Sequence, residues 1–335
     1  MIERLEEQAV DLAVVGAGTM GVGIAQVAVA RGLIVTLYDA FPEAVERGAG
    51  RVRAGLERSV ERGRLTAEER DAALERLSTT ATLDDLAPAP FVIEAAPEDL
   101  ALKRAIFARL DELCAPDAIL ATNTSSLSVT KVAAAVGRPA RVAGMHFFNP
   151  VPVMALVEVV AGHLTVEATV ERVTALAERL GKRPVRAKDT PGFIVNRVAR
   201  HFYGEPLRIL AEGADVATID RIMRTGGNFK IGPFELMDLI GIDVNFAVTK
   251  SVFDAFFGEP RYRPHPIQER MVDAGTLGRK TGRGFYSYGD GNTPSHSRLT
   301  TSTSPEADVS PSASEADVSP SASEQDNRGG ADAER

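Results

Sequence analysis

The sequence predicts an α/β domain with a largely parallel sheet in residues 1–187, an all-helical domain in residues 188–290 and a disordered tail in residues 291–335. Two observations carry this prediction. In the first half, short apolar runs alternate with amphipathic helical stretches, which is typical of a parallel sheet with helices on both faces. After Thr190 the apolar residues follow a helical period up to about Tyr288, interrupted by glycine and proline.

The strands of the first domain are expected at five short apolar runs: Asp11–Val15, Ile34–Asp39, Phe91–Glu94, Ile119–Thr122 and Arg141–Met145. Between them, apolar residues recur at helical spacing in stretches such as Met20–Arg31, Pro42–Arg62 and Leu100–Leu113. Strands that are apolar throughout, rather than alternating, favour a sheet buried on both faces.

The tail is set apart by its composition. The nine-residue unit EADVSPSAS occurs twice in tandem, at residues 306–314 and 315–323, and no aromatic residue follows Asn292. Such a segment buries too little apolar surface to offset its ordering entropy, so we expect it to be disordered. An acidic docking segment is the alternative.

Composition excludes several classes of protein. Of 335 residues, 44% are hydrophobic and 25% charged, and Cys114 is the only cysteine, so no disulfide framework or cysteine-based zinc site is expected within one chain. We expect no metal site of any kind. The N-terminus is charged from its third residue, and no apolar run is long enough to span a bilayer, so we expect a cytoplasmic protein without membrane contact. Much of the net charge of −8 lies in the tail, and the nearly neutral remainder does not suggest a nucleic-acid partner.

A glycine-rich loop is the candidate cofactor site. Gly16-Ala17-Gly18-Thr19-Met20-Gly21 directly follows a predicted strand and opens a predicted helix. The first glycine permits the tight turn, the second lets a pyrophosphate approach, and the third allows close packing of helix on strand. Together with the helix N-terminus this predicts a Rossmann-type dinucleotide-binding domain. Asp39, at the end of the next strand, is placed to bind the ribose hydroxyls and repel a 2′-phosphate, so NAD is favoured over NADP.

His146 and Glu158 are the candidate proton-transferring pair. His146 is expected just past the strand Arg141–Met145, and open α/β sheets bind ligands at the carboxyl ends of their strands. Alcohol oxidation by NAD needs a group that accepts the hydroxyl proton, and histidine titrates in a suitable range. Glu158 lies in the apolar run Met154–Val160 and should be buried on either face. An imidazole would be a suitable partner. The alternatives are a histidine satisfied by backbone and a glutamate paired with arginine or amides.

Two further polar residues are placed near the same edge. Ser125, in Asn123-Thr124-Ser125-Ser126, follows the strand Ile119–Thr122, where a hydroxyl can donate to a substrate oxygen. One residue of this group is alternatively the N-cap of a helix over Leu127–Val136. Asn196 lies near the start of the first helix of the second domain, where its amide could polarise a carbonyl.

At these residues the chain resembles the L-3-hydroxyacyl-CoA dehydrogenase family, which includes 3-hydroxybutyryl-CoA dehydrogenases. The resemblance covers about residues 8–288 and rests on six strings in the same order: GAGTMGVGIAQV, NTSSLS, HFFNPVPVMALVEVV, KDTPGFIVNR, GPFELMDLIG and GRKTGRGFY. It implies that His146 is the proton-transferring base and that Glu158 orients it. It further implies that Ser125 contacts substrate and nicotinamide, and that Asn196 is a substrate-site residue.

The resemblance also implies cofactor contacts at Glu98, Lys103 and Lys280, and a homodimer formed by the C-terminal helices. Where the family often has lysines for coenzyme A, this chain has arginines, among them Arg58 and Arg62. Arginine binds phosphate at least as well as lysine, although a solvated helix face is the alternative.

The activity implied is the NAD-dependent interconversion of L-3-hydroxyacyl-CoA and 3-oxoacyl-CoA in fatty-acid or related acyl-CoA metabolism, including β-oxidation. The segment HFYGEPLRIL resembles members that act on 3-hydroxyadipyl-CoA in phenylacetate catabolism, which is one alternative substrate. The same fold also allows a free hydroxy-acid dehydrogenase or a non-catalytic dinucleotide-binding sensor.

Overall fold

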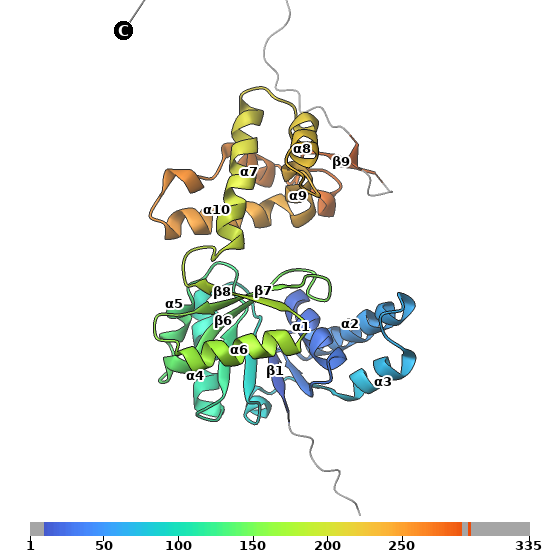
Figure 1. Ribbon diagram of the computed structural model, residues 1–335, viewed down its shortest axis with the longest axis vertical. Coiled ribbons are helices and arrows are strands. Elements are labelled where there is room, and N and C mark those ends of the chain that lie inside the picture. The colour runs from blue at the N-terminus through green and yellow to red at the C-terminus, as the bar shows by residue number, and fades with distance from the viewer. Residues whose placement is uncertain (1–9, 290–293, 296–335) are drawn as a thin grey trace, which may run out of the picture. The chain divides into compact units, whose positions relative to one another are not determined.

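A single eight-stranded sheet forms the centre of the N-terminal part of the molecule (Figure 1). The computed structural model describes residues 10–289 and 294–295. In the order β3-β2-β1-β4-β5-β6-β7-β8, all neighbouring strands are parallel except the antiparallel pair β6 and β7. The strands are β1 Leu12–Val15, β2 Val35–Tyr38, β3 Leu77–Thr80, β4 Phe91–Glu94, β5 Ile119–Thr122, β6 Val142–Phe147, β7 Leu156–Ala161 and β8 Arg183–Lys188.

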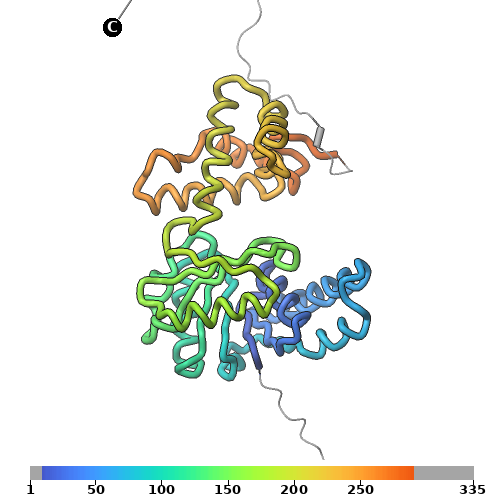
Figure 2. The backbone as a smooth tube through the Cα atoms, viewed as in Figure 1, coloured from blue at the N-terminus to red at the C-terminus, as the bar shows by residue number. Residues whose placement is uncertain are grey.

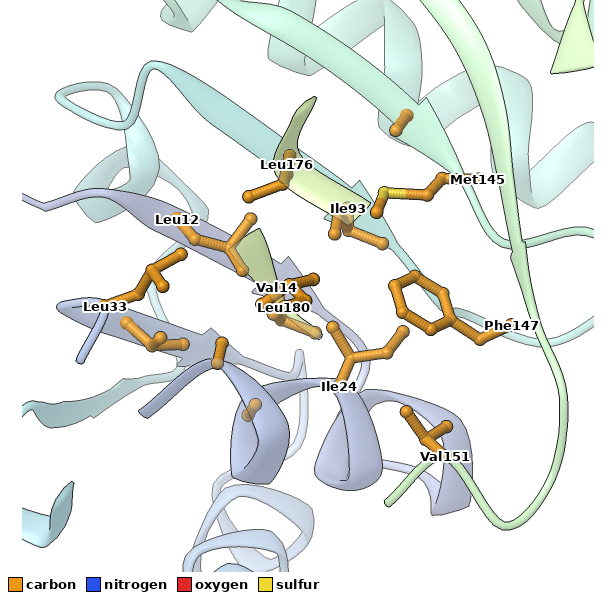
Figure 3. Close-up of a cluster of buried hydrophobic side chains, with 14 of the residues drawn as sticks. Leu12, Val14, Ile24, Leu33, Ile93, Met145, Phe147, Val151, Leu176 and Leu180 are labelled. Carbon is orange, nitrogen blue, oxygen red and sulfur yellow. The ribbon is translucent and has the colours of Figure 1, made fainter. Parts of the chain in front are cut away.

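Helices cover both faces of this sheet, as its fully buried strands require. Successive residues of β1 point to opposite faces: Leu12 and Val14 pack with α1, α2 and α6, whereas Ala13 and Val15 pack with α4 and α5. Figure 3 shows part of the first cluster, in which Phe147 at the end of β6 shares one core with α1. The helices are α1 Thr19–Ala30, α2 Pro42–Glu61, α3 Ala67–Glu75, α4 Leu100–Leu113, α5 Val129–Ala133 and α6 Glu167–Arg179.

The five predicted strands are confirmed, but β6 is longer than expected. It continues through Phe147, so His146 lies inside the strand and not just past it, because pairing with β7 extends the ladder. Strands β3 and β8 escaped prediction because they are half-exposed and polar; β8 even contains Pro184. The helix expected over Leu127–Val136 is only α5, and its N-cap is Ser128.

The C-terminal part is helical, as predicted, around its own apolar core. Its helices are α7 Val195–Ala211, α8 Val216–Thr225, α9 Pro233–Ile240, α10 Ile242–Ala255 and α11 Pro266–Asp273. The two-residue strands β9 Ser287–Tyr288 and β10 Pro294–Ser295 pair antiparallel. Apart from Pro294–Ser295, the predicted tail 291–335 lies outside the described residues. The boundary expected after residue 187 falls one residue before the end of β8.

In the described part of the chain, none of the helices combines the length and the apolar character needed to cross a bilayer.

Gly23 and Gly50 offer a matched test of how tightly α1 packs against the loop after β6. Both lie inside helices, but a Cβ added to Gly23 would lie 2.8 Å from Cβ of Val151, whereas one added to Gly50 meets no heavy atom within 4 Å. We expect Gly23→Ala to lower the free energy of unfolding by about 1–3 kcal/mol through overpacking. Gly50→Ala should raise it by about 0.5–1 kcal/mol through the reduced entropy of the unfolded chain. Urea unfolding measures both, and equal shifts would contradict the packing account.

Candidate active site

The loop between β1 and α1 has the shape that a pyrophosphate requires. Gly16 has φ 102°, and a Cβ added there would lie 2.7 Å from the carbonyl oxygen of Ala95. A Cβ added to Gly21 would lie 1.8 Å from the oxygen of Gly16, so only glycine lets the helix approach the strand. At Gly18 an added Cβ meets nothing within 4 Å, which leaves space for a ligand beside the backbone. The first turn of α1 has no side-chain cap and no acidic residue, so its amides suit phosphate oxygens.

Asp39 directly follows β2 and braces this loop. Its Oδ2 accepts a hydrogen bond from the Ala17 amide at 2.9 Å, and its Oδ1 accepts one from the Phe41 amide at 3.1 Å. Arg51 of α2 donates to the carbonyl oxygen of Ala17 from the other side. Sequence reasoning missed Arg51 because only the packing of α2 brings it back to the loop.

His146 and Glu158 face each other across the antiparallel pair of β6 and β7. Their side chains meet at 2.7 Å between Nδ1 and Oε2, and both residues are buried, with 5% and 1% of their surface exposed. A carboxylate on Nδ1 fixes the tautomer and leaves Nε2 as the proton acceptor. The imidazole also packs against the rings of Phe148 and Phe193. The structure thus joins the two residues that the sequence predicts as a pair.

The carboxylate of Glu158 is held ionised by its surroundings. Burial alone would raise the pKa of Glu158, but the hydrogen bond from His146 and those from the amides of Val195 and Ile194 outweigh it and lower the pKa. Both amides donate to Oε1 at 2.9 Å. Since these residues begin α7, the same carboxylate anchors the first turn of that helix. Figure 2 traces the backbone from the strands of the sheet into α7.

Ser125 and Asn196 form the second pair of predicted residues. Asn196 is the second residue of α7, and its Nδ2 donates to the carbonyl oxygen of Ser125 at 3.2 Å. The Phe147 amide donates to Oδ1 of Asn123 at 2.9 Å, which joins the ends of β5 and β6. The four predicted residues therefore converge on the carboxyl ends of these two strands and on the start of α7.

Glu98 holds the loop that carries Ser125. Its Oε1 accepts from the Ser125 amide at 2.9 Å, from the Ser125 hydroxyl at 3.3 Å and from the Thr124 hydroxyl at 2.6 Å. Burial acts to raise the pKa of Glu98, but these hydrogen bonds and the nearby Lys103 lower it overall. Its negative charge is therefore kept at neutral pH beside a loop that is expected to meet both substrate and cofactor.

Glu94 is a buried site residue that sequence reasoning left unassigned. It ends β4 with no exposed surface, and its Oε1 accepts from Nζ of Lys103 and from the Ala96 amide, each at 2.6 Å. Its Oε2 accepts from the Thr122 hydroxyl at 2.7 Å. The ammonium of Lys103 is thus occupied by protein acceptors, and its expected cofactor contact stays a prediction. The sequence did contain a signal for Glu94, namely an acidic residue at the end of an apolar strand.

The remaining predicted contacts lie on the surface. Arg58 and Arg62, at the end of α2, are exposed. A cleft of about 450 Å³ is lined in part by residues close to them in sequence, but not by these two arginines. Arg64, Ser59 and Lys182 line this cleft, together with the loop after β6. Nζ of Lys280 forms an ion pair with Asp243 at 2.6 Å. Their roles toward substrate and cofactor stay predictions.

The fold, the glycine loop and the buried His–Glu pair define a dinucleotide-dependent oxidoreductase. Residues 11–190 match the family model for the 3-hydroxyacyl-CoA dehydrogenase NAD binding domain, and residues 192–288 match the model for the C-terminal domain of the same enzymes. The chain therefore belongs to the 3-hydroxyacyl-CoA dehydrogenase family, and its cofactor is NAD.

Individual relatives agree with this assignment. The chain is 51% identical over 278 residues to a 3-hydroxyadipyl-CoA dehydrogenase of Escherichia coli; the match covers 83% of this chain but only 58% of that relative. It is 45% identical over 278 residues to a 3-hydroxybutyryl-CoA dehydrogenase of Mycobacterium tuberculosis, covering 82% of this chain and 97% of the relative. The crystal structure of (S)-3-hydroxybutyryl-CoA dehydrogenase from Ralstonia eutropha superposes with a TM-score of 0.81 at 44% identity, covering 84% and 99% of the two chains.

Cofactor selectivity tests the position of Asp39. Asp39→Asn keeps the shape and one acceptor but removes the charge that repels a 2′-phosphate. We expect the ratio of kcat/KM for NAD to that for NADP to fall at least about tenfold, equivalent to about 1.4 kcal/mol. Glu43→Gln removes an exposed carboxylate at the start of α2 and is the matched control. Its ratio of kcat/KM for NAD to that for NADP should equal the wild-type ratio. Wild-type protein that uses both cofactors equally well would refute the role of Asp39.

Proposed function

We propose that this chain oxidises L-3-hydroxyacyl-CoA to 3-oxoacyl-CoA with NAD, or runs the reverse reduction. The observation that carries the proposal is the buried pair of His146 and Glu158, with Nδ1 and Oε2 2.7 Å apart. Membership of the 3-hydroxyacyl-CoA dehydrogenase family and the names of the relatives support the substrate class. Those names include both a monocarboxylic and a dicarboxylic acyl chain, so both kinds of ester are candidate substrates.

In the oxidative direction Nε2 of His146 accepts the proton of the substrate hydroxyl. Glu158 stays ionised beside the imidazolium that forms and stabilises it electrostatically. Ser125 and Asn196 hold the substrate oxygens on the other side of the site. Bound NAD supplies the hydride acceptor for C3. Burial of the pair keeps water away from the imidazole and strengthens its bond to the carboxylate.

The coenzyme A moiety is proposed to lie along the end of α2. Arg58 and Arg62 present exposed guanidinium groups there, beside the cleft that Arg64 and Lys182 line. Several cations at one helix end suit the phosphates of coenzyme A, because each guanidinium can form two parallel charge-assisted hydrogen bonds.

We further propose a homodimer formed by the C-terminal helices, acting in cytoplasmic acyl-CoA metabolism that includes β-oxidation. Support for the dimer comes from large apolar residues that the helical part leaves exposed, among them Val198 at 65%, Leu239 at 52% and Val244 at 48%. Where such residues form a contiguous patch, they mark a surface that a partner covers.

The activity is tested by following NADH formation with 3-hydroxybutyryl-CoA, 3-hydroxyadipyl-CoA and free 3-hydroxybutyrate. We expect turnover of the coenzyme A esters and none of the free acid, since only the esters engage the cations at the end of α2. Preference for the free acid would favour a hydroxy-acid dehydrogenase. Cofactor binding without turnover of any of the three compounds would favour a non-catalytic role.

Variants of the pair test the mechanism directly. We expect His146→Gln and Glu158→Gln each to lower kcat by about 100-fold or more with little change in NAD affinity. The double variant should be little worse than His146→Gln alone, because residues that act as a unit are not additive. His163→Gln, an exposed histidine after β7, is the control and should keep its activity. Fully additive losses would mean that Glu158 acts independently of His146.

A further inference from the structure

Arg200, in the second turn of α7, is a buried cation without an anionic partner. Only 5% of its surface is exposed. Its Nε donates to the carbonyl oxygen of Asn196 at 3.0 Å, and its Nη1 donates to the carbonyl oxygen of Asn245 at 3.1 Å and to the Thr249 hydroxyl at 2.6 Å. Among residues 10–289, no carboxylate forms an ion pair with Arg200 and no acceptor is bonded to its Nη2.

Two other buried cations of the described chain pair with carboxylates: Lys103 with Glu94, and Arg141 with Asp111. Lys182, like Arg200, is satisfied by uncharged acceptors, since its Nζ donates to the carbonyl oxygens of Val151 and Met154, and it lines the cleft near α2. Burial lowers the pKa of Arg200 to about 10, so the guanidinium is still charged at neutral pH. Keeping a charge buried without a counter-ion is costly. Three hydrogen bonds and the ring of Tyr203, whose centroid lies 5.1 Å from Cζ, offset part of this cost, and a bound anion would offset more of it.

The surroundings of Arg200 favour an anion over a neutral group. A small cavity of about 10 Å³ lies beside it, with room for about one water molecule. Arg263 and the hydroxyl-bearing Thr249 also line this cavity, and its lining includes no acidic residue. Arg261, which pairs with Glu259 at 3.0 Å, and His265, whose pKa is lowered by burial and by nearby arginines, also belong to its polar lining. The cavity therefore suits the oxygen of a terminal anionic group and excludes a bulky chain.

Arg200 lies on the same helix as Asn196, which is proposed to hold a substrate oxygen. It is four residues beyond Asn196, which corresponds to a rise of about 6 Å along α7. In an acyl chain of six carbons, three C–C bonds of about 1.5 Å each separate C3 from a terminal carboxyl carbon. A carboxylate at the end of such a chain can therefore reach Arg200 while C3 lies near Asn196.

We propose that Arg200 binds the terminal carboxylate of a dicarboxylic substrate, a 3-hydroxyacyl-CoA whose acyl chain ends in a carboxylate. This inference rests on the proposed function and narrows it to one substrate class. The carboxylate would supply the missing counter-ion and accept charge-assisted hydrogen bonds from the guanidinium.

The test compares kcat/KM for 3-hydroxyadipyl-CoA and 3-hydroxybutyryl-CoA in wild-type protein, Arg200→Met and Arg200→Lys. We expect wild-type protein to prefer the dicarboxylic ester and Arg200→Met to lower the ratio of the two values at least about tenfold, mainly through KM. Arg200→Lys should keep part of the preference. Arg208→Met replaces an exposed arginine two turns further along α7 and should leave the ratio unchanged. Because both kcat/KM values are measured on the same protein sample, their ratio does not depend on the fraction of the protein that is folded.

The possible outcomes distinguish a failure of this inference from a failure of the proposed function. Turnover of 3-hydroxybutyryl-CoA with a ratio that Arg200→Met does not change would overturn the inference and leave the proposed function standing. Absence of turnover with either ester would overturn the proposed function itself. If Arg200→Met does not fold, the same test is made with Arg200→Lys and with Thr249→Val. The second variant removes the hydroxyl that accepts a hydrogen bond from the guanidinium.

A second arm distinguishes a substrate site from a general anion site. Adipate and inorganic phosphate are added separately to wild-type protein that is turning over 3-hydroxybutyryl-CoA. Inhibition by adipate that weakens in Arg200→Lys, with no effect of phosphate at the same concentration and ionic strength, is expected. Equal effects of both anions would show a non-selective site and contradict the assignment of a substrate carboxylate.

Discussion

The carboxylate of Glu158 is the group on which the rest of the site depends. It is buried, yet each of its oxygens has a defined partner: Oε2 meets the imidazole of His146, and Oε1 accepts the first amides of α7. This arrangement requires the antiparallel pairing of β6 and β7, which sets the two residues opposite each other in an otherwise parallel sheet. An ordinary parallel crossover at this point could not place residues so close in sequence at one position.

Much of this site could be predicted from the sequence because its signals are local. Each of the three glycines of the loop is required for a different steric reason. The structure shows a positive φ at Gly16, open space at Gly18 and a close backbone approach at Gly21. Glu158 could be predicted as buried because both faces of its strand are apolar. Five strands likewise followed from short apolar runs, since buried parallel strands need no alternation.

Features that depend on packing could not be predicted. β3 and β8 are half-exposed and polar, so their sequences carry no apolar run, and β6 gains its last residues only through pairing with β7. Arg51 reaches the glycine loop only because α2 folds back over it. Arg200 looks like a surface residue of an amphipathic helix until α10 covers it. In each case the contact that determines the outcome is made with a segment distant in sequence. Neither composition nor hydrophobic periodicity could therefore predict it.

The shared carboxylate of Glu158 has a thermodynamic consequence. The imidazole of His146 and the first turn of α7 both bind one carboxylate, one through each oxygen. Binding equilibria that meet at a common group are linked, and the linkage is reciprocal. The strength of the bond between the imidazole and the carboxylate therefore depends on how firmly α7 is held, and α7 is held more or less firmly by the same free energy when the imidazole moves.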